Sequence, residues 1–139
     1  MLVIKLVKHC LLALVLITGM GSQAFAEEAN SSGDLLYTAI EPAFVLNYGG
    51  PGRLKYLKAG ITLVTASPLA AQTVNHHMPL IRNEIVSLLS RQTDDAVTSP
   101  VGQEQMRIDA TQVVKDLFQK EVGHPVIEDL LFTNFIYQK

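Results

Sequence analysis

The first part of the chain combines positive charge, a short apolar run and small residues, in that order. Two lysines precede an apolar stretch at residues 10–20, and the small-residue motif AFA follows at residues 24–26. A stretch of this length is well short of the roughly 20 apolar residues that a helix needs to cross a bilayer. The three regions in this order are typical of a secretory signal peptide. The pattern therefore predicts cleavage after Ala26, which leaves Glu27 as the new N-terminus.

The alternative for the same segment is an uncleaved membrane anchor that begins at Leu2. Such an anchor would place Lys5, Lys8 and His9 at membrane depth or leave them to reach back to the cytoplasmic face. Cys10 does not fit a lipid attachment site, because Lys8 and His9 stand where that motif requires leucine and small residues. The signal peptide at residues 1–26 is the favoured interpretation.

Turn residues and strand formers dominate the next part of the chain. Residues 27–34 are rich in Glu, Asn, Ser and Gly, which predicts a flexible lead-in before a single folded domain at residues 35–139. Strand-forming residues follow up to Tyr48, with a break at Pro42, which cannot donate to a strand ladder. The motif NYGGPG at residues 47–52 then predicts the turn of a β-hairpin, because a strand and not a helix follows it.

Two helical segments are predicted in the middle of the chain. Apolar residues at residues 79–90 recur at helical spacing, and Pro79 is tolerated in a first turn. If this helix starts near Ala71 instead, Pro79 should kink it. A polar connection follows at residues 91–99, and Ser99 before Pro100 is typical of a helix N-cap.

The second helix is expected to end at Gly123 and Pro125, and one last strand follows it. Residues 126–137 mix β-branched and aromatic side chains on both faces, which predicts a strand buried on part of both faces. The order strand, strand, helix, helix, strand predicts an α+β fold class: a small antiparallel or mixed sheet with two helices packed on one face.

Loss of the leader would change both the charge and the cysteine content. Removal of Lys5 and Lys8 lowers Lys plus Arg from 11 to 9 against 13 acidic residues, so the formal net charge becomes −4. A chain of this charge lacks the positive stripe that nucleic-acid phosphates require. Cys10, the single cysteine, would also leave, and the remaining 113 residues (139 minus 26) cannot form a disulfide.

Two groups of polar residues are candidates for chemistry. His76, His77 and His124 suggest a metal site, but adjacent residues do not share a helix face and no tetrahedral ligand set is complete, so we expect solvent-facing imidazoles and no metal. Asp94 and Asp95 lie in a polar segment, where we expect a solvated or helix-capping pair and not an acid–base dyad. Without a GxSxG motif or a mature thiol, we expect no catalytic residue and no cofactor.

Five segments together resemble one known family. They are AFVLNY at 43–48, LKYLKAGITL at 54–63, MPLIRNEIVSLLS at 78–90, RQTDD at 91–95 and LLFTNFIYQ at 130–138. In this order they are similar to the strands, helix and terminal strand of the flagellar basal-body-associated FliL family. The similarity covers residues 40–138.

The resemblance implies a stomatin/prohibitin-like periplasmic domain that acts as a non-enzymatic accessory of the flagellar basal body. It implies homo-oligomeric rings at the inner membrane that contact flagellar stator and basal-body proteins and support swimming or swarming, without a small-molecule substrate. Typical members keep an N-terminal membrane helix, whereas this chain is predicted to lose its leader. A periplasmic oligomeric scaffold of the same fold, unrelated to motility, is the alternative.

The predicted leader is tested by the intact mass of the native protein. We expect a mass that begins at Glu27 and a protein released in a periplasmic extract, because the apolar run is too short to span a bilayer. A mass that includes residues 1–26, together with membrane association that resists carbonate, would establish the anchor instead.

Overall fold

The computed structural model describes residues 34–139, so the predicted leader and residues 27–33 of the lead-in lie outside the described residues. The described chain contains four strands and four helices in a single unit. The elements are β1 (Leu36–Ala39), β2 (Phe44–Tyr48), β3 (Lys55–Thr65), α2 (Pro68–His76), α3 (Met78–Ser90), α4 (Asp94–Thr98), α5 (Pro100–Val122) and β4 (Asp129–Gln138).

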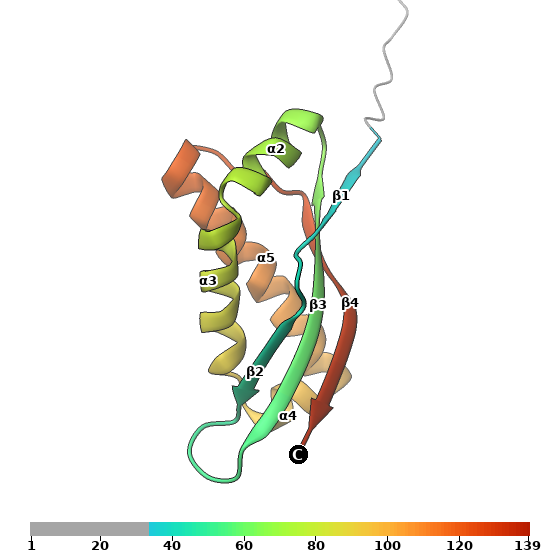
Figure 1. Ribbon diagram of the computed structural model, residues 1–139, viewed down its shortest axis with the longest axis vertical. Coiled ribbons are helices and arrows are strands. Elements are labelled where there is room, and N and C mark those ends of the chain that lie inside the picture. Colours follow the sequence, from blue (N-terminus) through green and yellow to red (C-terminus); the bar gives the residue numbers. More distant parts are fainter. Residues whose placement is uncertain (1–33) are drawn as a thin grey trace, which may run out of the picture. The chain divides into compact units, whose positions relative to one another are not determined.

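The sheet is built around β3, the longest strand (Figure 1). β4 pairs with β3 from Tyr56 to Val64, while β2 pairs with its first half and β1 with its last four residues. Since β4 occupies one edge of β3 over most of its length, β1 and β2 share the opposite edge. All pairings are antiparallel, which confirms the predicted α+β class and the predicted β2–β3 hairpin.

The core lies between one face of the sheet and the helices, which all lie on that side (Figure 1). Alternate residues of β3 point inward and are fully covered, and the buried residues of α3 and α5 recur every three or four positions to meet them. These inward residues are Leu57, Ala59, Ile61 and Leu63 of β3, Ile81, Ile85 and Leu89 of α3, and Met106, Ala110, Val114 and Phe118 of α5.

An arginine side chain of α3 connects the break between β1 and β2 to the helices. The guanidinium of Arg82 on α3 donates a hydrogen bond of 2.8 Å to the carbonyl of Pro42 and lies 4.5 Å above the ring of Phe44. The contact combines a charge-assisted hydrogen bond with a cation–π interaction. The predicted break at Pro42 is therefore held against α3 by the arginine of the MPLIR segment.

The described residues contain four helices, so the expected number of two is wrong. The predicted helix at residues 79–90 corresponds to α3, with Pro79 in its first turn, whereas the alternative of one helix kinked at Pro79 is wrong, because α2 stops at His76 and α3 starts at Met78. The proline has no N–H and its ring would collide with the carbonyl four residues back, so the backbone turns at His77. The start of α2 repeats the Ser-Pro signal of α5, since Ser67 caps it and Pro68 follows.

The predicted polar connection at residues 91–99 contains the short helix α4, which leads directly into α5. The side chain of Ser99 accepts a hydrogen bond of 3.1 Å from the Gly102 N–H, which confirms the predicted N-cap. A Cβ at Gly102 would lie 2.3 Å from the carbonyl oxygen of Ala96. Only glycine allows α4 and α5 to approach this closely.

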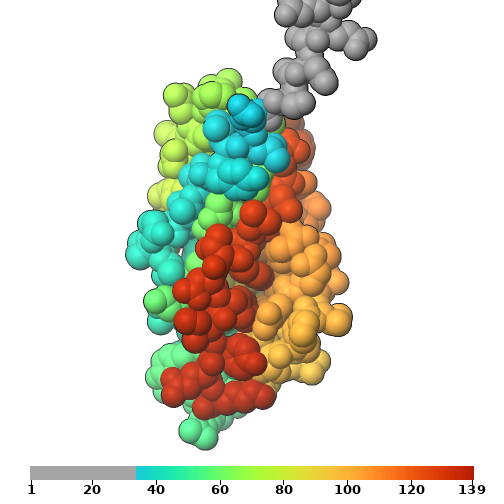
Figure 2. Space-filling view, turned by 90° about the vertical axis from the view of Figure 1, so that its right-hand side faces the viewer, coloured from blue at the N-terminus to red at the C-terminus, as the bar shows by residue number. Residues whose placement is uncertain are grey.

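The terminal strand is integral to the sheet, but the burial predicted on part of both faces does not extend to the outer face of its second half. Leu130 is fully buried and Phe135 is half-buried, whereas Ile136 is 56 % exposed. An irregularity opposite Gly60 and Ile61 of β3 leaves Thr133 without a partner and shifts the register. No described helix covers the outer face here, and the side chains from Thr133 to Gln138 are exposed except for the half-buried Phe135. Figure 2 shows β4 running along the surface of the molecule.

Two phenylalanine-to-alanine substitutions test this difference in burial. Phe118→Ala should lower the free energy of unfolding by about 3 to 5 kcal/mol, because it empties a fully buried site. Phe135→Ala should cost about 1 to 2 kcal/mol, since its ring is half-buried and loses less apolar contact. Urea denaturation of both variants gives the two values. Equal losses would contradict the described packing and mean that the Phe135 ring is covered in solution.

Candidate functional site

The three histidines that the sequence singles out lie in different environments. His76 is exposed at the end of α2, and His124 is exposed in the loop after α5. His77 is half-buried. Its Nδ1 lies 2.8 Å from the Thr73 carbonyl oxygen, and its ring is T-shaped to the ring of Phe118, with the two ring centroids 5.6 Å apart. The expectation of a solvent-facing imidazole is therefore wrong for His77, which packs on the core.

Metal coordination has no candidate in the described part of the chain. Residues 34–139 contain no group of three or more His, Cys, Asp or Glu side chains placed to hold an ion. The structure does bring His76 and His77 together, with their ring centroids 5.0 Å apart, but no carboxylate joins them. Two imidazoles fall short of the four ligands of a structural zinc site.

Of the two adjacent aspartates, Asp94 forms a charged cluster with Tyr48, Lys55 and Lys139, here named the Asp94 cluster. Its carboxylate lies 3.1 Å from the Lys55 ammonium and 3.5 Å from that of Lys139, and it accepts a hydrogen bond of 3.4 Å from the Tyr48 hydroxyl. The sequence predicts a solvated or helix-capping pair: both aspartates do lie in the first turn of α4, but Thr93 is the N-cap and Asp94 is held in ion pairs.

The Asp94 cluster shifts two pKa values in opposite directions. The hydrogen bond from Lys55, helped by the charge of Lys139, lowers the pKa of the Asp94 carboxyl. Burial raises the pKa of the Tyr48 hydroxyl, and the neighbouring Asp94 carboxylate raises it further. The raised pKa keeps the Tyr48 phenol neutral, and the lowered pKa keeps the Asp94 carboxylate ionised beside the ammonium groups of Lys55 and Lys139. The ammonium groups of Lys55 and Lys139 thus favour the ionised form of the Asp94 carboxylate.

The position of the cluster explains what it holds together. Lys55 begins β3, Asp94 begins α4 and Lys139 follows β4, so the cluster links the hairpin, the α3–α4 turn and the C-terminal end of the described sheet. A backbone hydrogen bond of 3.1 Å from the Gly49 N–H to the Gln92 carbonyl connects the hairpin to the same turn. The sequence gives no sign of this convergence, because the residues are distant along the chain.

A second polar network connects α5 to the start of β4. The guanidinium of Arg107 lies 2.5 Å from the Asp129 carboxylate and 2.8 Å from that of Glu104, and it also donates to the Leu130 carbonyl. Asp129 accepts further hydrogen bonds from the Leu130 N–H and the Thr111 hydroxyl. Partial burial would raise the pKa of Asp129, but these donors outweigh it and lower the pKa.

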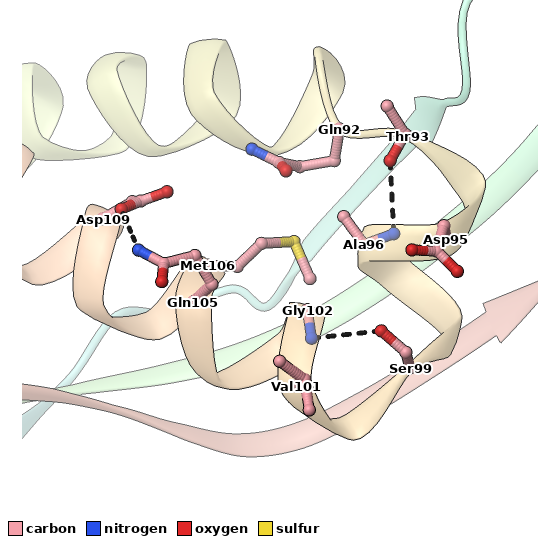
Figure 3. A pocket seen from close by; sticks show the side chains of 10 residues that line it. All are labelled: Gln92, Thr93, Asp95, Ala96, Ser99, Val101, Gly102, Gln105, Met106 and Asp109. Atoms are coloured by element: carbon pink, nitrogen blue, oxygen red, sulfur yellow. Dashed lines mark hydrogen bonds between the residues drawn. The ribbon is translucent and has the colours of Figure 1, made fainter.

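An open pocket of about 340 Å³ lies beside the α4–α5 junction (Figure 3). Most of its polar side chains form hydrogen bonds within the helical segments. The hydroxyls of Thr93 and Ser99 accept hydrogen bonds from backbone N–H groups, and the Gln105 amide donates to Asp109 at 2.8 Å. Met106 lies on the core side of the pocket and is almost fully buried. The pocket shows no nucleophile–base pair among its lining residues.

The described helices include none that combines the length and the apolar character needed to cross a membrane. The fold and its polar networks define the class: a two-layer α+β domain whose charged side chains join secondary-structure elements. The chain belongs to the flagellar basal body-associated protein FliL family, whose model matches residues 37–138. The resemblance drawn from the sequence motifs is therefore confirmed.

One curated relative is the "Flagellar protein FliL" of Aquifex aeolicus (strain VF5). The two sequences are 27 % identical over 99 residues, which cover 71 % of this chain and 59 % of the relative. The match thus spans about three fifths of the length of the curated relative.

The Arg107 network generates a prediction for the pH dependence of stability. Because the folded-state pKa of Asp129 is lowered, its contribution is present above the unfolded-state pKa of about 3.9 and is lost as the pH falls through the folded value. Asp129→Asn should therefore cost about 1 kcal/mol at pH 7, the low end for hydrogen bonds to a charged group that solvent partly screens.

Urea denaturation from pH 7 to pH 3 measures the effect. The difference between Asp129→Asn and the unaltered protein should shrink as the pH falls, because the wild-type carboxylate also becomes neutral. The control is Asp116→Asn, since that carboxylate only accepts a hydrogen bond from Gln112 within α5. A difference that stays constant down to pH 3 would contradict the role of the charge.

Proposed function

We propose that this protein is a non-enzymatic accessory of the flagellar basal body that acts in the periplasm and supports the stator units during swimming or swarming. The observation that carries the proposal is the family match over residues 37–138, which is nearly the whole described domain. The relative in Aquifex aeolicus is named a flagellar protein. In this proposal the protein forms homo-oligomers and binds stator and basal-body proteins at the inner membrane.

The roles of the motif residues support a contact function over catalysis. Arg82 of the MPLIR segment holds the β1–β2 break, and Asp94 of the RQTDD segment holds the end of the β2–β3 hairpin. The FTNF segment supplies Phe132 and Phe135, whose rings are 5.2 Å apart at the edge of the core. These three segments thus stabilise the shape of the domain, and a protein that acts through its surface depends on that shape.

The alternative is a periplasmic oligomeric scaffold of the same fold without a role in motility. The predicted removable leader favours it, since a basal-body accessory is expected to keep an anchor. Fold alone does not separate the two functions, because one fold supports unrelated activities.

Localisation of the full chain separates these two functions. A fusion to a fluorescent protein that matures in the periplasm should form foci at flagellar bases, and deletion of the gene should reduce swimming or swarming. The foci should disappear in a strain without basal bodies, which is the control for nonspecific clustering. A uniform periplasmic signal with normal motility would contradict the flagellar role and favour the scaffold.

A further inference from the structure

The outer face of the sheet, opposite the helices, carries a patch of apolar side chains with one cation among them. The registers place Val45 of β2, Lys58 of β3 and Ile136 of β4 in one row across the three strands. Tyr56 lies two residues from Lys58 on β3 and therefore points to the same face, diagonal to Val45 and Ile136. These four residues are named the outer-face patch.

The outer-face patch is exposed although it is apolar. Val45 is 70 %, Ile136 56 % and Tyr56 46 % exposed, and no described helix lies on this side of the sheet (Figure 1). An antiparallel sheet can keep one face in water, but its outward positions are then usually polar. Three large apolar side chains on neighbouring strands are unlike such a solvated face, and contiguous apolar surface of this kind marks interaction sites.

Lys58 gives the patch a charge preference. It is exposed, and it takes part in none of the ion pairs found among residues 34–139. The positions beside it in its row are Val45 and Ile136, and its neighbours along β3 on the same face are Tyr56 and Gly60, so no carboxylate faces it from an adjacent outward position. A partner that covers the apolar side chains would therefore have to bring a negative group to this lysine.

We propose that the outer-face patch binds an amphipathic helix of another protein, which packs its apolar side on Val45, Tyr56 and Ile136 and places an aspartate or glutamate against Lys58. A helix is the favoured occupant because helices are what cover sheet faces in two-layer α+β domains, as α3 and α5 do on the inner side. The complex would be a three-layer arrangement with the sheet in the middle. The proposal concerns this surface alone and does not depend on the flagellar assignment.

Site-specific photo-crosslinking in cells that make the full chain tests the proposal. p-Benzoylphenylalanine replaces Ile136, and a matched control carries it at Val101, which is 82 % exposed but lies on the helical layer. Illumination should give an adduct from position 136 and not from position 101. Mass spectrometry should map the adduct to a segment of another protein with apolar residues at helical spacing and an acidic residue among them.

The charge preference is tested on the same adduct. Lys58→Glu should lower its yield by about tenfold or more, Lys58→Gln should lower it less, and a lysine in place of the partner's acidic residue should restore binding to Lys58→Glu. Circular dichroism should show unchanged folding, because Lys58 is exposed. An adduct to a second copy of this chain, the same adduct from position 101, no adduct from position 136, or a yield unaffected by Lys58→Glu would each overturn the proposal.

Discussion

The fold depends on the burial of the inward side of β3. This strand pairs with each of the other three described strands, and its inward residues from Leu57 to Leu63 contribute apolar side chains to one core with α3 and α5. The free energy gained by burying apolar side chains is proportional to the apolar area removed from water. No other described strand pairs with as many strands as β3 does. The edge strands and helices keep their positions because this strand orders them.

Three cationic side chains then connect the periphery to that core. Arg82 connects the β1–β2 break to α3, Arg107 connects α5 to the start of β4, and Lys55 connects the hairpin to α4. In each case the partner lies in a different segment of the chain. The contact therefore restrains two segments relative to one another, in addition to the hydrophobic core. Charge-assisted hydrogen bonds have directional geometry, which apolar contacts lack.

The two faces of the sheet differ in how far their side chains are covered. The inner face supplies stability, whereas the outer face carries apolar side chains that the described chain does not cover. The chain belongs to a family that is associated with the flagellar basal body, and its described residues leave this sheet face uncovered. Substitutions on the outer face can therefore alter association while the core keeps its stability.

Local signals in the sequence were sufficient for most elements of the fold. Helical spacing identified α3 and α5, Ser99 and Pro100 marked a helix start, and the glycine-rich turn marked the hairpin. These features depend on residues within one or two turns of each other, so their signal is contained in a short window. The α2 helix carried the same Ser-Pro signal at Ser67 and could have been found from it.

The tertiary structure alone decided the environments of the polar side chains and of β4. Asp94 and Asp95 are neighbours in sequence, yet Asp94 contacts Lys55 and Lys139, which are distant along the chain. The sequence of β4 places large apolar side chains on both faces, and Ile136 stays in solvent because burial depends on whether another layer covers that face. A sequence window records which side chains are apolar or charged, but their partners come from strand register and helix packing, which only the folded chain determines.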